Sequence, residues 1–207
     1  SLVGSEMCIR DRYWSRSYDI LGGKRSQGGF FMIRLALAAP EERFREQILA
    51  YRTEFLEAGD HMAGCAGLDQ SPSFERWLQA VRANSREETV GRGLVPASNY
   101  LAVRLADHRL VGFIDVRHRL NEVLLQSGGH IGYSVRPGER RQGYATEMLQ
   151  LALLKCRERG MHRILITCRK ENIASARTIQ SCGGVLENEV VKDGQVYQRY
   201  WILLSST

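Results

Sequence analysis

The sequence predicts an α/β fold of the mixed α+β type. Some short segments alternate apolar and polar residues with period two, as strands do, whereas others repeat apolar residues at helical spacing. The order of these segments along the chain is strand, helix, helix, hairpin, strand–helix, strand–helix and a final hairpin. Locally paired strands mixed with helices are typical of α+β domains.

The first half of the chain should hold a short strand over 31–37, two helices and a hairpin. Proline and acids at Pro40-Glu41-Glu42 favour a helix start, and Gly59-Asp60 ends that helix. Its predicted buried face consists of Phe44, Ile48, Tyr51 and Phe55. The predicted face of the second helix, over 74–83, consists of Phe74, Trp77, Leu78 and Val81. Period-two alternation then predicts a hairpin over 100–105 and 110–117.

In the second half, residues 130–135 alternate as a half-buried strand does, and Pro137-Gly138 ends it. The helix that follows carries an apolar stripe of Ala145, Met148, Leu149, Ala152, Leu153 and Cys156, and it stops at Gly160. A continuous apolar run predicts a strand over 163–168 that is buried on both faces. The remaining predicted elements are a helix over 173–182 and a hairpin over 185–191 and 195–204.

The turn between the strand at 130–135 and its helix has the character of an anion site. Arg140 and Arg141 supply positive charge, Gly143 and Ala145 allow close approach to the backbone, and the first turn of a helix has unpaired N–H groups. The sequence has no G-x-x-x-x-G-K-[ST] motif, and no G-x-G-x-x-G follows a strand, which disfavours nucleotide kinases and dinucleotide dehydrogenases. An ordinary strand–helix unit with an arginine-rich connection is the alternative interpretation.

Composition and charge narrow the class of protein. The 207 residues are 43% apolar and 25% charged, which is typical of a globular chain, and no apolar run is long enough for a membrane span. A net charge of +6 suits a polyanionic ligand, but the scattered arginines disfavour nucleic acid. The five cysteines lack C-x-x-C spacing, so we expect free thiols, no metal and a cytoplasmic location.

Residues 1–31 do not read as part of this domain. They lack sustained periodicity, and Leu2 to Asp11 look like translated sequencing-adapter DNA. We expect an artefactual leader with Met32 as the true start, or else a disordered natural tail. The predicted folded domain is therefore 32–207.

The R-x-x-G-x-A pattern from Arg140 to Ala145 resembles the acyl-CoA pyrophosphate loop of the GNAT superfamily of N-acetyltransferases. Asn172 with Ser175 and Ala176 is similar to the family's N-x-x-(A/S)-A segment, and Gly183 has the spacing of its helix-ending glycine. The resemblance covers Met32 to about Leu204 and looks closest to a poorly characterised bacterial subgroup of predicted acetyltransferases. It implies a mixed, mostly antiparallel central sheet that is splayed in the middle, with helices on both faces.

The resemblance also implies acetyl-CoA as the acyl donor and assigns residues to it. The implied cofactor-binding residues are Tyr133, Ser134, Val135, Arg140, Arg141, Gln142, Gly143, Tyr144, Ala145, Thr146, Asn172 and Ser175. A backbone N–H near Tyr133 would stabilise the developing negative charge. His130 lies near the position where several members place a base, although a structural histidine is the alternative. Ile179 replaces the tyrosine that many members use to protonate the thiolate, so water or another side chain must act, or the thiolate leaves unassisted.

The acceptor is left open by the sequence. His118, Asn121 and Glu122 could line its pocket, although solvated loop residues are the alternative. We expect Asp115 to face solvent and Cys168 to be a small core residue. We expect the acceptor to be a small-molecule or peptide amine. We expect no nucleic-acid or membrane partner, and a homodimer is possible. The leading hypothesis is an acetyl-CoA-dependent N-acetyltransferase, with a non-catalytic acyl-CoA-binding module second and a nucleic-acid adaptor third.

Overall fold

A computed structural model describes residues 33–204 of the chain. All of these residues belong to one compact unit, Ile33–Thr207. The leader expected over 1–31 lies outside the described residues, so its nature and the domain boundary stay predictions.

The order of the elements agrees with the predicted one. In chain order the strands are β1 (Leu35–Ala38), β2 (Ala97–Arg104), β3 (Leu110–Arg117), β4 (Ile131–Val135), β5 (Arg163–Arg169), β6 (Val185–Lys192) and β7 (Gln195–Leu203). The helices are the 3-10 turn η1 (Glu42–Phe44), α2 (Arg45–Glu57), α3 (Phe74–Ala83), α4 (Glu122–Gln126), the 3-10 turn η2 (Pro137–Glu139), α5 (Tyr144–Glu158) and α6 (Ile173–Ser181).

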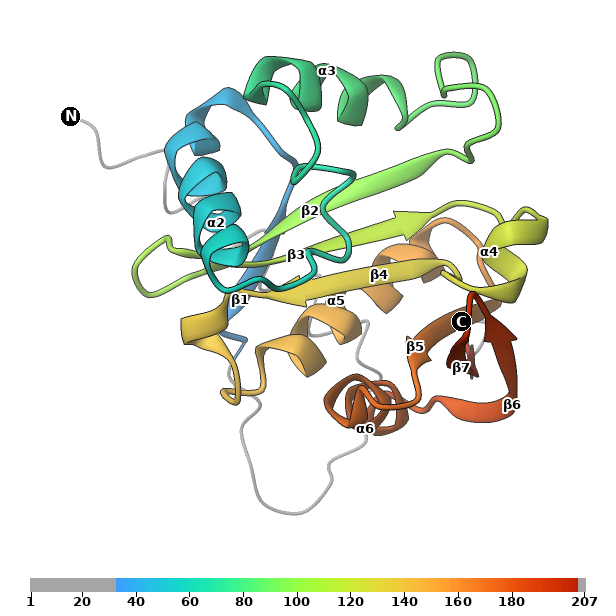
Figure 1. Cartoon of the computed structure of the whole chain (residues 1–207). Coiled ribbons are helices and arrows are strands. Elements are labelled where there is room, and N and C mark those ends of the chain that lie inside the picture. The colour runs from blue at the N-terminus through green and yellow to red at the C-terminus, as the bar shows by residue number, and fades with distance from the viewer. Residues whose placement is uncertain (1–32, 205–207) are drawn as a thin grey trace. The chain divides into compact units, whose positions relative to one another are not determined.

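The strands form two antiparallel sheets. One has the order β1-β2-β3-β4 and the other β5-β7-β6. β4 is therefore an edge strand of the first sheet and β5 an edge strand of the second, and the two edges lie side by side (Figure 1). Within residues 33–204 no strand ladder joins them, so the structure is split where the predicted sheet was expected to splay.

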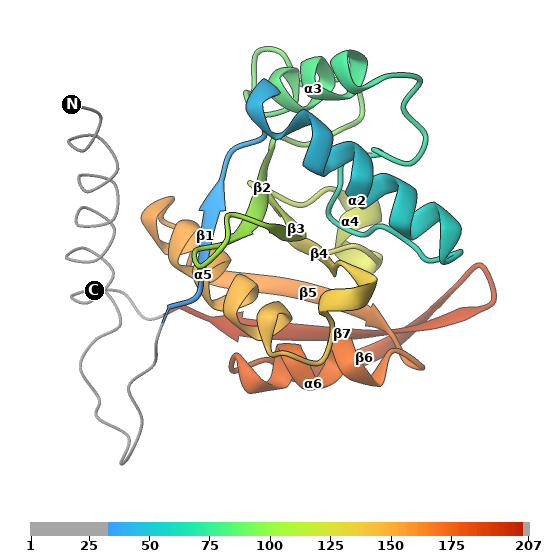
Figure 2. The same ribbon diagram turned by 90° about the vertical axis from the view of Figure 1, so that its left-hand side faces the viewer.

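Helices cover both faces of the four-stranded sheet. α2 and α3 lie on one face, where their aromatic side chains pack on β2 and β3, and α5 lies on the other (Figure 2). α6 packs beside α5 and β5. This layering buries most of β3, from Leu110 to Val116, and it makes β3 the centre of the fold.

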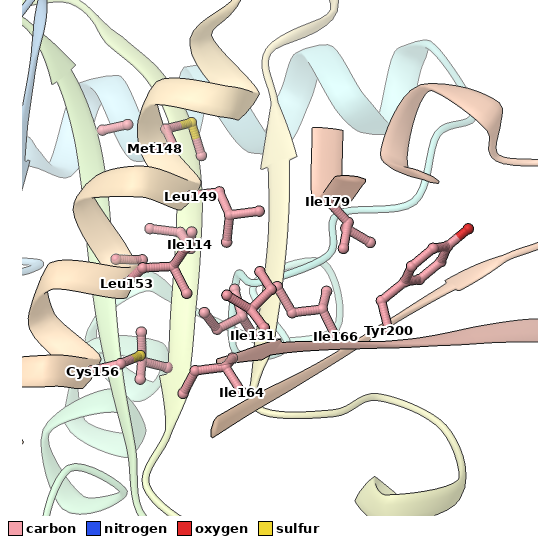
Figure 3. Close-up of a cluster of buried hydrophobic side chains, with 14 of the residues drawn as sticks. Ile114, Ile131, Met148, Leu149, Leu153, Cys156, Ile164, Ile166, Ile179 and Tyr200 are labelled. Carbon is pink, nitrogen blue, oxygen red and sulfur yellow. The ribbon is translucent and has the colours of Figure 1, made fainter. Parts of the chain in front are cut away.

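The larger core connects the two sheets on the α5 side. It joins Met148, Leu149 and Leu153 of α5 to Ile131 of β4 and Ile164 of β5 (Figure 3). Burial of large apolar side chains contributes roughly 1.5–3 kcal/mol each. The sheets are thus held together by side chains beneath their facing edges.

Two local expectations were wrong, at β4 and at the start of the first helix. The face of β4 that was expected to be open is buried at Ser134, because α2 and the segment after it cover this residue. His130, just before the strand, is buried as well, and it contacts Leu165 of β5. The first α-helix begins at Arg45, since a 3-10 turn precedes it, and Phe44 is only half-buried. β6 is exposed along most of its length because it is the outer strand of its sheet.

Candidate active site

The turn after β4 has the backbone conformation of an open anion site. Arg141 and Gly143 have positive φ values, 64° and 81°, and α5 begins directly afterwards at Tyr144. Residues 140–143 are exposed. The N–H of Glu147 makes the first bond of the helix, to Gly143 C=O, so the N–H groups at the start of α5 are free of intrahelical partners.

An ion pair beneath the turn fixes the start of α5. The buried carboxylate of Glu147 accepts hydrogen bonds from the backbone N–H groups of Arg34, at 2.6 Å, and Leu35, at 2.9 Å. It also pairs with the Arg34 guanidinium, and that guanidinium donates to Gln142 C=O at 3.0 Å. Arg34 and the first residue of β1, Leu35, therefore hold the first turn of α5 and the loop before it.

A second network holds the other side of the turn. The carboxylate of Glu139 is nearly buried and pairs with Arg104 at 2.7 Å and with Arg109 at 2.9 Å. The amide of Gln142 donates to the same carboxylate, and the hydroxyl of Tyr144 accepts from Arg104. Two carboxylates thus anchor the turn from below while its upper surface stays exposed.

The two predicted loop arginines differ in their surroundings. Arg140 pairs with Asp60 at 2.8 Å, donates to Val135 C=O and stacks on the ring of Phe55. Its charge is therefore partly neutralised. Arg141 is exposed, and within residues 33–204 its side chain makes no ion pair. Arg141 is the better placed of the two to meet an anion at the turn.

The edge of β4 presents backbone donors toward β5. Arg136 N–H donates to Val111 C=O on β3 at 2.8 Å. Because hydrogen-bonded pairs alternate along an antiparallel ladder, the N–H groups of Tyr133 and Val135 point away from β3 and toward the gap between the sheets. A chain of donors therefore runs from the middle of β4 to the turn.

The side chain of Tyr133 crosses from β4 to the start of α6. Its hydroxyl lies 2.9 Å from Ser175 Oγ, and burial raises the pKa of Tyr133 above its ordinary value. Asn172 caps α6, since its side chain accepts from Ser175 N–H at 3.0 Å. Tyr133, Asn172 and Ser175 therefore lie around one point beside the edge of β4.

Two other residues near α6 belong to the core. Ile179, which stands where many family members have tyrosine, is fully buried and cannot reach a bound thiol. Cys168 is buried as well, as predicted, and burial raises the pKa of its thiol to about 11. A thiol with this pKa is almost wholly protonated at neutral pH and is a weak nucleophile.

His130 lies at the point where the two sheets meet. Its backbone N–H donates to Leu165 C=O at 2.7 Å, and its ring Nδ1 accepts from Leu165 N–H at 2.9 Å. Burial, with a smaller effect of Arg117, lowers the pKa of His130 to about 4. The ring is therefore neutral with its proton on Nε2, and its one acceptor atom is occupied. This geometry favours the structural alternative over a role as a base.

The predicted acceptor residues gather at the other end of β4. His118 Nε2 lies 2.9 Å from Ser98 Oγ, and burial lowers the pKa of His118. Asn121 caps α4 by accepting from Leu124 N–H, and Glu122 is exposed in the first turn of that helix. These three residues lie near one another in sequence but are not brought to the turn at Arg140–Gly143.

Asp115 was expected to face solvent, and this was wrong. It is buried, with 6% of its surface exposed, because the segment between α2 and α3 covers it. Its carboxylate accepts from Gly132 N–H at 2.9 Å and pairs with Arg117 at 3.1 Å. Burial raises the pKa of Asp115, while Arg117 opposes this effect.

Sequence reasoning missed the residues that support the turn. Glu147 is an acid within the apolar face of α5, next to Met148, and that position was a usable signal for a buried partner. Arg34 had no such signal, since its partners Gln142 and Glu147 are more than one hundred residues away along the chain.

A split sheet with donors along one edge, leading to an exposed helix start with free N–H groups, is the architecture of an acyltransferase domain. The family model described as "Acetyltransferase (GNAT) domain" matches residues 52–185. The chain therefore belongs to the GNAT acetyltransferases, a family of transferases, which confirms the resemblance.

Solved structures support the same fold. The chain is similar to RimL, a ribosomal alpha-N-protein acetyltransferase in complex with coenzyme A, with 18% identity and a TM-score of 0.64 over 85% of this chain and 97% of that one. It is also similar to a putative ribosomal-protein-serine acetyltransferase from Vibrio cholerae, with 20% identity and a TM-score of 0.58 over 86% and 98%.

A third similar structure is a chimera of the spermidine N-acetyltransferase SpeG from Vibrio cholerae and hSSAT, with 18% identity and a TM-score of 0.58 over 82% of this chain and 95% of that one. A comparison with curated proteins found no match. None of the helices in residues 33–204 has the length and apolar character that crossing a membrane requires.

Proposed function

We propose that this protein transfers an acetyl group from acetyl-CoA to a primary amine by direct attack of the amine on the thioester. The observation that carries the proposal is the continuous row of backbone donors from Tyr133 along the edge of β4 to the exposed start of α5. Such a row suits a ligand with a polar arm at one end and a diphosphate at the other.

The diphosphate of coenzyme A would lie over the turn from Arg140 to Thr146. The free N–H groups at the start of α5 and its dipole favour a dianion there. Arg141, which is exposed, adds positive charge, whereas the Arg140 guanidinium already pairs with Asp60. Gly143 leaves the backbone open, since a Cβ there would meet only Arg34 within 4 Å.

The pantetheine arm would follow Val135 and Ser134 to Tyr133, whose N–H points into the gap between the sheets. In this position the N–H would stabilise the negative charge that develops on the thioester oxygen. A fixed donor of this kind is commonly worth about a hundredfold or more in rate. Ser175 and Asn172, at the start of α6, would lie on the opposite side of the arm.

The reaction also requires that the amine lose a proton and that the departing thiolate gain one. An amine with a pKa near 10.4 must lose a proton before it attacks, and the geometry of His130 leaves no free acceptor atom for it. We infer that the amine loses its proton to water or to the polar residues at the His118 end of β4. The departing thiolate has an ordinary pKa near 8.5, and the hydroxyls of Tyr133 and Ser175 are the donors that the structure offers it.

The similar structures suggest acceptors to test. One of them acetylates a ribosomal protein and another is a spermidine acetyltransferase. We would incubate the protein with acetyl-CoA and measure release of free thiol with spermidine and with short peptides that begin with serine or alanine. Turnover with any of them supports the proposal. Tight binding of acetyl-CoA without turnover on a broad amine panel would favour the non-catalytic acyl-CoA-binding module instead.

A further inference from the structure

The segment between α2 and α3 touches β4 at one backbone position. Gly64 has a φ of 77°, and a Cβ atom on it would lie 2.4 Å from Gly132 O and 3.0 Å from Tyr133 Cα. Real Cβ atoms do not approach backbone this closely. The main chain of Gly64 therefore lies directly against the peptide group that joins Gly132 to Tyr133.

The peptide group before Gly132 is held as well. Gly132 N–H donates to the buried carboxylate of Asp115 at 2.9 Å, and Arg117 pairs with the other oxygen of that carboxylate at 3.1 Å. A Cβ on Gly132 would lie 2.6 Å from Asp115 Oδ1. Both peptide groups around Gly132 thus have close partners, one from a side chain of β3 and the other from the segment between α2 and α3.

Side chains from the sheet fix the segment that carries Gly64. Asn99 Nδ2 donates to Gly64 C=O at 3.4 Å, and Ser134 Oγ donates to Ala63 C=O at 2.6 Å. The hydroxyl of Ser134 also lies 3.1 Å from that of Tyr51 on α2. Gly64 is therefore held in place and can act as a support for β4.

We propose that Gly64 and Asp115 are positioning residues that fix the direction of the Tyr133 N–H donor. In a trans peptide the N–H points opposite to the C=O of the residue before it, so restraining Gly132 C=O aims the N–H of Tyr133 into the gap between the sheets. This inference rests on the proposed function. It extends that function by assigning the orientation of the donor to residues outside the cofactor loop.

The test compares Gly64→Ala with Gly67→Ala. Both glycines lie in the same segment and have similar positive φ values, 77° and 72°, but a Cβ at Gly67 meets nothing within 4 Å. The two variants share the backbone strain, and only Gly64→Ala pushes on the peptide of Tyr133. The probe is acetyl-CoA labelled with ¹³C at the thioester carbonyl, whose infrared stretching frequency falls when the carbonyl oxygen accepts a hydrogen bond.

We expect wild type and Gly67→Ala to bind the labelled acetyl-CoA and to lower its carbonyl frequency. Gly64→Ala should keep the dissociation constant of coenzyme A but lose the frequency shift. With the best acceptor of the amine panel, its kcat should fall on the order of a hundredfold, as expected when a reacting group is displaced by about 1 Å. An unchanged carbonyl shift in folded Gly64→Ala would overturn the inference.

Asp115 provides an independent pair of variants should Gly64→Ala not fold. Asp115→Asn keeps an oxygen acceptor for Gly132 N–H, whereas Asp115→Ala removes it. We expect the carbonyl shift to persist in the first and to be lost in the second, and equal shifts in both would overturn the inference. A wild-type protein that does not bind acetyl-CoA would instead refute the proposed function itself, so the two failures are distinguishable.

Discussion

The two ends of β4 are built differently, although one short strand connects them. At its carboxyl end the chain enters an exposed turn, with two positive φ values and free N–H groups at the start of α5. At its amino end His130 is buried and makes two hydrogen bonds to Leu165 on β5. The sheets are therefore joined at one end of β4 and separate at the other.

This difference shows how a sheet can keep an open edge without losing stability. At the joined end, donors and acceptors satisfy one another within the protein. At the open end the stabilising contacts lie underneath, in the ion pairs of Glu147 and Glu139 and in the apolar core that includes Tyr144 and Met148 of α5. Backbone donors on the upper surface are then left for a ligand. Four predictions test this division.

The largest effect is expected at the open end. Gly143→Glu places a negative charge and a side chain at a φ of 81° beside the helix start, so it should abolish the rise in melting temperature that acetyl-CoA causes in wild type. The control is Gly160→Glu, which adds the same charge at a similar φ of 74° at the other end of α5. Differential scanning fluorimetry measures both, and a full thermal shift in Gly143→Glu would contradict the assigned site.

The hydrogen bonds of Glu147 beneath the turn should be the next most sensitive to substitution. Glu147→Ala leaves the N–H groups of Arg34 and Leu35 without their acceptor, which should cost about 3 kcal/mol of unfolding free energy. Glu147→Gln keeps the acceptor oxygen and should lose less. The exposed carboxylate of Glu158, whose Lys155 ion pair is on the surface, serves as the control, and Glu158→Ala should change stability by less than about 1 kcal/mol. Urea titration measures all three.

At the joined end, burial of His130 should make the free energy of unfolding depend on pH. The pKa of His130 is lowered to about 4 in the folded protein, against about 6.5 in the unfolded chain. Between these values the unfolded chain binds the additional proton, so stability falls as the pH drops from about 6.5 to 4, by up to about 3 kcal/mol from this residue.

His130→Asn tests that prediction, because an amide oxygen can still accept from Leu165 N–H but does not titrate. Urea unfolding at a series of pH values should show a shallower loss of stability in the variant than in wild type. A kcat/KM profile with a pKa near 6.5 that disappears in His130→Asn would argue against this structural role and restore the histidine as a base.

The smallest effect is expected between the two ends. Tyr133→Phe removes the hydroxyl that bonds Ser175 but keeps the backbone N–H and the ring. If the N–H is the catalytically important group of this residue, kcat should fall by less than about tenfold, with KM for acetyl-CoA unchanged. Steady-state kinetics checks this, and a far larger loss of kcat would show that the hydroxyl protonates the departing thiolate.

Much of the open end could be predicted from local sequence, and most of the joined end could not. Proline, glycine and the helical stripe mark the turn and α5 because they act through the backbone within a few residues. The partners of His130, Asp115 and Glu147 come from segments that are distant in sequence. No short sequence pattern shows that Leu165 N–H donates to the ring of His130, or that the segment at Gly64 buries Asp115.

The amino-acid sequence by itself determined the order of the elements, the turn before α5 and the family to which the chain belongs, because these depend on periodicity and on conformational preferences within single elements. The tertiary structure alone decided which charged and polar groups are buried and what they bond. It placed the ring of His130 against Leu165 N–H, put Glu147 beneath the turn and turned Asp115 inward. Burial and hydrogen-bond partners depend on which distant segments meet, and local chemistry does not contain that information.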